Sequence, residues 1–292
     1  MTTVFDFSVQ AVAALAQADV ERALREDVGA ADLTAGLVNR TRRATAKVLV
    51  REDAVICGGP WVEAAIKALD PTAEMVWYVG EGQRARADQV VLEVHGLAHA
   101  LLTAERTALN FMQLLSAVAT KTNDYVQAIH DVPGLRARIV DTRKTIPGLR
   151  MAQKYAVRTG GGINHRLGLY DAVLIKENHI AAAGGVVQVM RLAQEVAPSA
   201  SFVEIEVENI DQLEEALQAG ANMVLLDNMS FALLHEAVRV NAGRAILEVS
   251  GGVNMSSVRA IACTGVDRIS IGALTKDIKA IDFSMRFSPD AV

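Results

Sequence analysis

Apolar residues recur at helical spacing near the start of the chain and then in short runs. Residues 9–26 carry apolar side chains every three or four positions, which predicts helix. Short valine-rich runs punctuated by glycine follow, which is typical of strands. These runs lie at 44–50, 54–57, 75–79 and 90–94, with a helix expected at 61–69. The pattern predicts a small α/β domain.

A long helix and a second rhythm follow. Residues 98–120 carry apolar side chains on one stripe, which predicts a single helix. Beyond it, apolar strand-like runs alternate with helical segments such as 211–219 and 256–264, as in a parallel sheet covered by helices. The runs lie at 137–140, 172–175, 202–207, 223–226, 245–249 and 268–271. They are apolar almost throughout, as parallel strands buried on both faces are.

Polar or glycine-rich residues end most of these runs. In (β/α) barrels the active site lies at the carboxyl ends of the strands, whereas a doubly wound sheet places its chemistry at one switch point. The endings lie at 141–144, 176–179, 227–228, 250–252 and 272–273. Because they are spread over several strands, we expect a barrel. Six clear strands fall short of eight, so the barrel should be incomplete or distorted.

Composition and charge narrow the classes of function. The chain has 292 residues, 51% hydrophobic and 22% charged, which suits a globular protein of one large or two ordinary domains. A net charge of −5 argues against a nucleic-acid binder. We find no signal-peptide pattern and no apolar run of membrane-spanning length. With only two cysteines, the sequence predicts a reduced, cytoplasmic protein that has no membrane partner.

Cationic side chains nevertheless gather at the predicted strand ends. They are Arg143, Lys144, His165, Arg166 and Lys176. Lys176 closes an apolar run and must therefore lie at the rim of the core. A pocket of this charge suits a multiply anionic ligand, because arginine binds carboxylates and phosphates in bidentate pairs. The alternative is a set of solvated surface charges.

Carboxylates are expected to face these cations. Glu204, Glu206 and Glu208 alternate along one strand, and the period of two places them on the same face. Asp227 ends the next strand. Glu206 and Asp227 could hold ribose hydroxyls, or Mg²⁺ through water. Salt bridges to the cationic side chains are the alternative, and both roles are compatible.

Two glycine-containing turns and one arginine complete the candidates. Ser250-Gly251-Gly252 and Gly272-Ala273 each follow a strand and precede a helical segment, so their backbone N–H groups can approach a phosphate. Two such turns late in a barrel match the usual phosphate site of that fold. Arg106 lies on an apolar face of the long helix, where it could simply extend into solvent.

Several motifs together resemble those of the quinolinate phosphoribosyltransferases, also called nicotinate-nucleotide pyrophosphorylases. The central one is Asp-Thr-Arg-Lys-Thr-Ile-Pro-Gly-Leu-Arg at 141–150. The others lie, in the family's order, at 105–111, 164–168, 175–179, 206–209, 225–229, 248–251 and 270–275. The resemblance implies an N-terminal α/β sandwich domain, residues 1–119 joined by the tail 280–292. It also implies an incomplete, seven-stranded α/β barrel at 120–279. A last strand at 282–287 would return to the first domain.

The resemblance also implies an activity. A pentosyltransferase of this family joins quinolinate to phosphoribosyl pyrophosphate in de novo NAD biosynthesis, releasing nicotinate mononucleotide, pyrophosphate and carbon dioxide. It uses Mg²⁺ and acts as a homodimer or higher oligomer with shared active sites, Arg106 serving the neighbouring subunit.

The same resemblance assigns roles to residues. Lys144, Lys176, Glu206 and Asp227 would be catalytic, with Glu206 and Asp227 also holding the metal, directly or through water. Quinolinate would be held by Arg106, Arg143, His165 and Arg166. Phosphoribosyl pyrophosphate would contact Thr142, Lys144, Lys176, Glu206, Asp227, Ser250, Gly251, Gly252, Gly272 and Ala273.

Two other functions stay open from the residues alone. A Schiff-base aldolase also places a lysine at the end of a barrel strand, although Glu177 directly after Lys176 does not favour the lowered amine pKa that this chemistry needs. A non-catalytic sugar-phosphate-binding protein, or a paralogue of altered specificity, would bind phosphoribosyl pyrophosphate without releasing carbon dioxide from quinolinate.

Overall fold

The computed structural model describes residues 5–288. These residues divide into two compact units. The first contains residues 5–123, 146–161 and 277–288, and the second contains 124–145 and 162–276. The expected domain limits differ from these units chiefly at 146–161, which was expected in the barrel and clusters with the first unit. Residues 289–292 of the expected tail lie outside the described residues.

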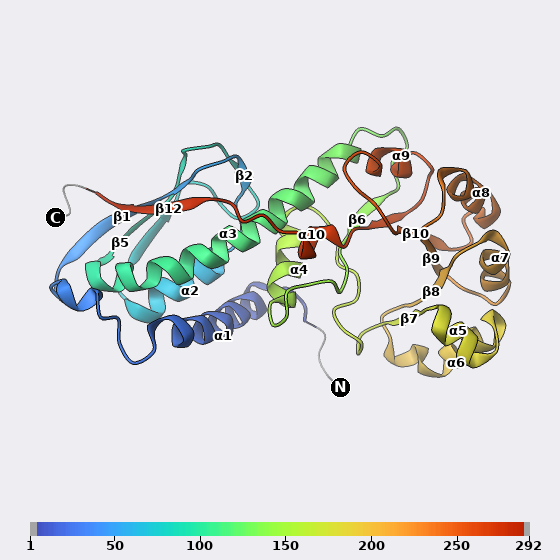
Figure 1. The fold of residues 1–292 in the computed structure, drawn as a ribbon, viewed down its shortest axis with the longest axis horizontal. Helices are drawn as coiled ribbons and strands as arrows, with labels where there is room; N and C mark the ends of the chain where they lie inside the picture. The colour runs from blue at the N-terminus through green and yellow to red at the C-terminus, as the bar shows by residue number, and fades with distance from the viewer. Residues whose placement is uncertain (1–4, 289–292) are drawn as a thin grey trace. The chain divides into compact units, whose positions relative to one another are not determined.

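A four-stranded antiparallel sheet forms the first unit, in the order β12-β1-β5-β3. β1 (Arg43–Val50) alternates exposed or half-buried with buried side chains, so one of its faces lies on the core. It pairs with β5 (Val90–Leu97) and with β12 (Phe283–Phe287), so the end of the chain completes this sheet (Figure 1). β3 (Glu74–Trp77) pairs with β5, and β2 (Ala54–Val55) with β4 (Arg84–Ala85).

The helices of this unit begin and end where the sequence supplies signals. Ser8 caps the first helix by accepting a hydrogen bond from the Ala11 N–H, and the buried Trp61 donates to Asp19 at 2.9 Å, joining two helices. The elements are α1 (Val9–Val28), η1 (Ala35–Leu37), α2 (Gly59–Leu69), α3 (Ala98–Ile129) and α4 (Arg150–Thr159). α3 continues nine residues past the predicted end at 120, because buried Tyr125 and Ile129 extend its apolar face.

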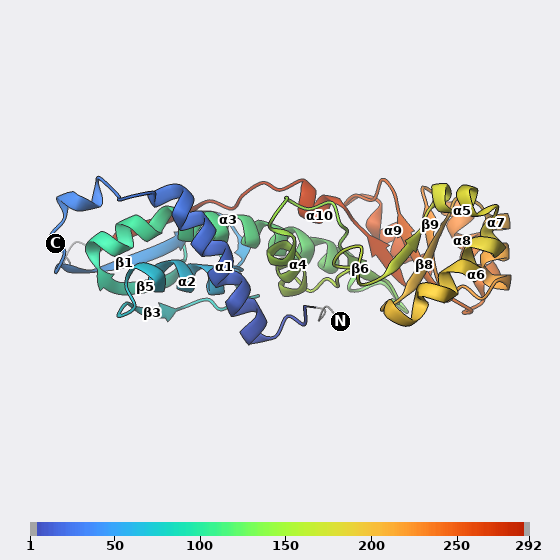
Figure 2. The same cartoon turned by 90° about the horizontal axis from the view of Figure 1, so that it is seen from below.

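A six-stranded parallel sheet forms the second unit, in the order β6-β11-β10-β9-β8-β7. The strands are β6 (Arg138–Val140), β7 (Val173–Ile175), β8 (Val203–Val207), β9 (Met223–Asp227), β10 (Ile246–Ser250) and β11 (Arg268–Ser270). The helices that follow these strands along the chain are α5 (Glu177–Ala183), α6 (Val186–Val196), α7 (Ile210–Gln218), α8 (Phe231–Asn241), α9 (Val258–Ala262) and α10 (Ala273–Lys276), with η2 (Ala197–Ser199). Figure 2 shows α5, α6, α7 and α8 beside β8 and β9.

The barrel expected from the sequence is incomplete. β6 and β7 lie at opposite ends of the sheet order, so the strands do not close into a ring. The sheet has six strands rather than the seven that the resemblance implies. In place of a further strand, Ile163 makes one isolated parallel bridge with Val140. No helix among the described residues is both long and apolar enough to cross a membrane.

Candidate active site

Three of the five predicted cations lie at the carboxyl ends of strands in the second unit, whereas His165 and Arg166 follow Ile163, which makes only an isolated bridge. Arg143 and Lys144 follow β6, and Lys176 lies between β7 and α5. The loop after β6 is held to the segment after β11, because the Thr275 hydroxyl donates to the Lys144 carbonyl at 2.7 Å. Gly272 lies so near that a Cβ there would stand 3.0 Å from Lys144 Cδ. Two of the motifs are therefore in contact.

Lys176 pairs with a predicted carboxylate. Its Nζ lies 2.8 Å from Glu206 Oε2, with the lysine half-buried and the glutamate 12% exposed. The salt bridge that the sequence analysis gave as an alternative role for Glu206 is therefore present. Glu208 lies beyond the end of β8 and is exposed, so the prediction that three glutamates share one strand face was wrong for the third.

Asp227 ends β9, beside Ser250 of β10 in the strand register. Asn228 donates to the Asp227 carboxylate at 2.8 Å. Gly251, with a φ of +98°, comes so close to Asn228 that a Cβ would lie 2.0 Å from its Oδ1. Glycine is required there, because the φ is in the left-handed region and the space is taken.

Glu206 and Asp227 come from neighbouring strands and fit a hard cation. Carboxylate oxygens are preferred Mg²⁺ ligands, and a metal of this kind completes its shell with waters or substrate oxygens. Within residues 5–288, these two carboxylates do not belong to a preformed cluster of three ligands.

Arg143 and Arg166 form the most cationic part of the site. Burial lowers the pKa of Arg166, and the neighbouring Arg143 lowers it further, whereas Asp171 and Glu204 oppose this. The buried Nε of Arg143 has no hydrogen-bond partner within the described part of the chain. Arg166 Nη1 donates to the Ala172 carbonyl at 3.3 Å. Two guanidinium groups this close are best stabilised by an anion between them.

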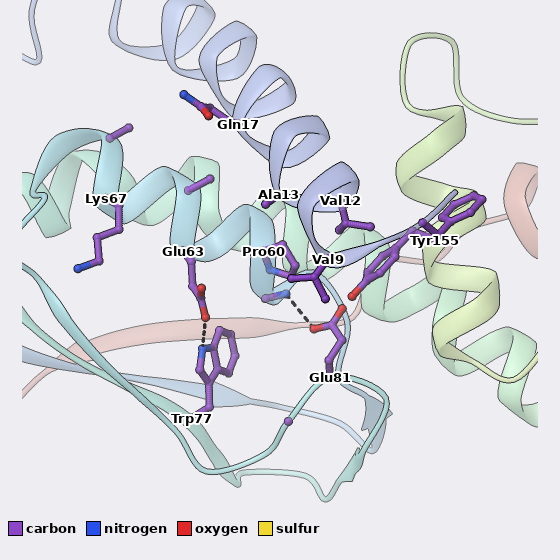
Figure 3. A pocket seen from close by; sticks show the side chains of 15 residues that line it. Val9, Val12, Ala13, Gln17, Pro60, Glu63, Lys67, Trp77, Glu81 and Tyr155 are labelled. Carbon is purple, nitrogen blue, oxygen red and sulfur yellow. Dashed lines mark hydrogen bonds between the residues drawn. The ribbon is translucent and has the colours of Figure 1, made fainter. Parts of the chain in front are cut away.

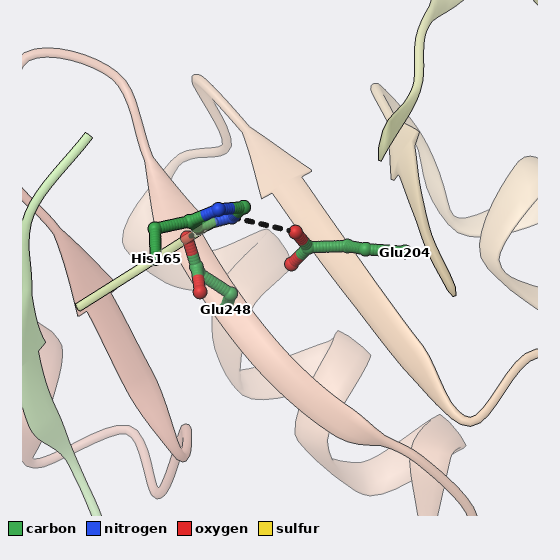
Figure 4. A group of neighbouring side chains, drawn as sticks. All are labelled: His165, Glu204 and Glu248. Atoms are coloured by element: carbon green, nitrogen blue, oxygen red, sulfur yellow. Dashed lines mark hydrogen bonds and ion pairs between the residues drawn. The ribbon is translucent and has the colours of Figure 1, made fainter. Parts of the chain in front are cut away.

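His165 is buried among carboxylates rather than pointing to solvent (Figure 4). The Arg166 N–H donates to its Nδ1 at 2.8 Å, so its proton lies on Nε2 and is donated to Glu204 Oε2, also at 2.8 Å. Glu248 Oε1 lies 3.5 Å from the same Nε2. The ring therefore makes different contacts from those implied for a quinolinate ligand.

Glu204 and Glu248 share a low-dielectric environment. Burial raises the pKa of Glu204 to about 7, with Arg268 opposing and Glu206 adding to the increase. Burial raises the pKa of Glu248 to about 7 as well, and the charge of Glu204 contributes. Arg268 Nε donates to Glu248 Oε2 at 2.6 Å. Desolvation is the largest cause of both pKa increases, because a charged carboxylate loses its hydration inside the sheet.

Arg106 lies in the first unit, exposed on α3. Leu102 and Asn110, one turn away on either side, are exposed as well, which defines an open stripe on an otherwise buried helix. Arg106 makes no hydrogen bond or ion pair with the residues that the structure describes.

A cavity of about 750 Å³ also lies in the first unit, between α1, α2 and the loop after β3 (Figure 3). None of the predicted site residues lines it. Two of its polar groups are engaged within the lining or beside it: Trp77 Nε1 donates to Glu63 at 2.8 Å, and Glu81 accepts from the Gly58 and Gly59 N–H groups.

Three residues of the site were not singled out from the sequence: Asp141, Glu248 and Arg268. Asp141, which is fully buried, accepts from the His165 N–H at 2.8 Å. Glu248 and Arg268 stand side by side in the register of β10 and β11. The signal was present, because each is a charged residue within or directly after an apolar strand run and needs a partner there.

Comparisons with known proteins cover nearly the whole chain. The models "Quinolinate phosphoribosyl transferase, N-terminal domain" and "C-terminal domain" match residues 32–116 and 118–286. A probable nicotinate-nucleotide pyrophosphorylase (carboxylating) of Synechocystis is 41% identical over 266 residues, 90% of this chain and 89% of that protein. One of Bacillus subtilis is 37% identical, covering 89% of each chain. The solved structure of the nicotinate-nucleotide pyrophosphorylase from Francisella tularensis has a TM-score of 0.90 at 43% identity, over 94% of this chain and 97% of that one.

Proposed function

The chain belongs to the quinolinate phosphoribosyltransferase family, and we propose how its residues carry out the family reaction. That reaction transfers the phosphoribosyl group of phosphoribosyl pyrophosphate to quinolinate and releases pyrophosphate and carbon dioxide, giving nicotinate mononucleotide for NAD biosynthesis. The observation that carries the assignment of the site is the buried Nε of Arg143, which has no hydrogen-bond partner among the described residues, together with Arg166, whose pKa the charge of Arg143 lowers.

Quinolinate is the ligand for these guanidinium groups in this proposal. It carries two adjacent carboxylates, and bidentate pairing with arginine fits planar carboxylates. Arg106, exposed and without a partner in residues 5–288, supplies a further cation from a second subunit. His165 is included in the quinolinate site by the family resemblance.

Phosphoribosyl pyrophosphate binds along the neighbouring strand ends. Lys144 and Lys176 neutralise the pyrophosphate, Thr142 lies in the same loop, and the two turns offer backbone N–H groups to phosphate. These turns are Ser250-Gly251-Gly252 and Gly272-Ala273. Glu206 and Asp227 bind the ribose hydroxyls and Mg²⁺, which, when bound, neutralises charge on the leaving pyrophosphate.

The chemistry requires no nucleophilic side chain. The pyridine nitrogen attacks the anomeric carbon of the ribose, the bond to pyrophosphate breaks, and positive charge develops on the sugar. Glu206 and Asp227 stabilise that charge, and alignment of the two substrates supplies much of the rate. The bond between ring C2 and its carboxylate then breaks, and carbon dioxide leaves. The electron pair stays on C2, where the adjacent positive ring nitrogen stabilises it, and a proton from solvent takes the place of the carboxylate.

Release of carbon dioxide from quinolinate, with and without phosphoribosyl pyrophosphate, tests this assignment. We expect release only when both substrates and Mg²⁺ are present. Binding of phosphoribosyl pyrophosphate without release would favour the sugar-phosphate-binding alternative. Borohydride trapping of a carbonyl substrate on Lys176 would favour the aldolase.

We place the enzyme in the cytoplasm as a homodimer or higher oligomer with shared active sites. Both cysteines are free thiols, which suits a reducing compartment. In an isologous dimer each subunit lends Arg106 to its partner. Arg106→Ala and Lys176→Ala are then separately inactive, but in a mixed dimer one site carries both defects and the other neither.

Refolding the two variants together measures this complementation. Random exchange makes about half of the dimers mixed, so activity should return to roughly a quarter of wild type. If subunits exchange and the mixture stays inactive, Arg106 acts within its own chain or has only a structural role.

A further inference from the structure

Asn228 follows Asp227 at the end of β9 and has a left-handed backbone, with a φ of +52°. Most positions of this kind in the described part of the chain carry glycine, which has no Cβ to oppose a positive φ. Asparagine tolerates the conformation, but glycine would adopt it more easily. An asparagine at this position therefore points to a use for the side chain itself.

The side-chain amide of Asn228 contacts the neighbouring carboxylate. Its Nδ2 donates to Asp227 Oδ2 at 2.8 Å, and within residues 5–288 no other group hydrogen-bonds the Asp227 carboxylate. Glu206, by contrast, is held by its ion pair with Lys176 at 2.8 Å. The two carboxylates assigned to the ribose are thus fixed by different partners, one cationic and one neutral.

The turn after β10 in turn restrains Asn228. The Asn228 N–H donates to the Ser250 carbonyl at 3.0 Å, and Ser250 is the register partner of Asp227. The Asn228 Oδ1 occupies the space that a Cβ on Gly251 would need. Both the backbone and the side chain of Asn228 are therefore restrained, although the residue is exposed.

A single restrained donor is enough to orient the Asp227 carboxylate. The last side-chain torsion of aspartate is broad, so the half-buried carboxylate has no strong preference of its own. With Oδ2 engaged by Asn228, the carboxylate has one defined orientation. Its Oδ1 makes no hydrogen bond with the described residues and is the oxygen left for a ligand.

We infer that Asn228 is a positioning residue that orients the Asp227 carboxylate for the ribose of phosphoribosyl pyrophosphate and does not contact the substrate itself. This inference rests on the proposed function, in which Asp227 binds the ribose and stabilises the charge that develops on it. Hydrogen bonds and packing then connect the turn that takes phosphate, through Asn228, to the carboxylate that takes ribose. Such support from behind a binding group preserves its geometry.

Replacing Asn228 with glycine removes the amide and keeps a residue that adopts a positive φ. Calorimetry with Mg²⁺ and benzene-1,2-dicarboxylate, which lacks the nucleophilic ring nitrogen, measures the Kd of phosphoribosyl pyrophosphate without turnover. In Asn228→Gly this Kd should rise about tenfold, as on loss of an outer-shell partner, and kcat/KM for phosphoribosyl pyrophosphate should fall at least as much. The quinolinate Kd and the melting temperature should stay near their wild-type values, which a merely structural role would not allow.

A double-mutant cycle tests whether the effect passes through Asp227. In the Asp227→Asn background, the further change Asn228→Gly should alter the Kd of phosphoribosyl pyrophosphate less than about twofold. A tenfold increase that persists in this background would show direct contact between Asn228 and the substrate, and would overturn the inference. Unchanged affinity and turnover in Asn228→Gly, with an active wild type, would also overturn it while leaving the proposed function standing. A wild type that releases no carbon dioxide from quinolinate would refute the proposed function and the inference with it.

Ala242→Gly is the matched control. Ala242, at the end of α8, also has a positive φ, +46°, and is not among the site residues, so this change should leave both dissociation constants unchanged. If Asn228→Gly proves unstable, Asn228→Ala takes its place, because Ala242 shows that this chain accommodates alanine in a left-handed conformation. It removes the same amide and should weaken the binding of phosphoribosyl pyrophosphate to the same extent.

Discussion

Replacing Glu248 with glutamine should change how stability depends on pH. Burial raises the pKa of Glu248 to about 7 in the folded protein, above its ordinary value of 4.5. The folded state therefore holds this proton more tightly than the unfolded state does. The resulting stabilisation is fully present below pH 4.5, is lost as the pH rises towards 7, and changes no further above that.

The magnitude follows from the two pKa values. A displacement from 4.5 to about 7 corresponds to roughly 3 kcal/mol. Most of this, about 2–3 kcal/mol, falls between pH 5 and pH 8 by linkage. Glutamine cannot ionise, so between pH 5 and pH 8 the unfolding free energy of Glu248→Gln should fall by about 2–3 kcal/mol less than that of the wild type.

Urea denaturation followed by circular dichroism at pH 5, 6, 7 and 8 measures this difference. The comparison between pH values removes any constant offset caused by the altered contact with Arg268. Glu236→Gln, at a glutamate whose side chain is 46% exposed, is the control and should follow the wild-type curve. Parallel curves for wild type and Glu248→Gln would refute the view that Glu248 is protonated at its buried site near neutral pH.

Three further outcomes are expected. Asp227→Asn should lower turnover at least ~100-fold, with thermal melting and quinolinate titration nearly unchanged; a variant that unfolds would instead indicate a structural salt bridge. Nicotinate, with one carboxylate, should show a kcat/KM at least ~100-fold below that of quinolinate, because it leaves Arg143 and Arg166 incompletely paired; comparable values would contradict their assignment. Gly251→Ala should lower the free energy of unfolding by about 1–3 kcal/mol, because the φ of Gly251 is +98° and Asn228 occupies the space that a Cβ would need. An unchanged thermal melting temperature would contradict this.

Much of the architecture could be predicted from the periodicity of the chain. All six strand-like runs of the second half are strands in the structure, each within two residues of its expected bounds. Short runs of Val, Leu and Ile form buried parallel strands in most contexts, because such strands are apolar on both faces. The end of α3 was missed, because helical spacing does not tell where tertiary burial stops.

The sequence by itself determined which side chains reach the strand ends. A residue at or shortly after the end of a parallel strand lies near the carboxyl edge of the sheet whatever its neighbours are, so Lys144, Lys176 and Asp227 could be placed from the pattern alone. The family motifs then supplied the substrates that such a site binds.

Only the tertiary structure decided which of these residues meet. The order β6-β11-β10-β9-β8-β7 brings Glu248 beside Arg268, and it lets His165 reach Glu204, which stands 39 positions away in the chain. Local spacing carries no information on such pairs, because hydrogen bonds between distant segments depend on strand order and register. The buried role of His165 therefore emerged from the folded sheet and not from its place in the motif.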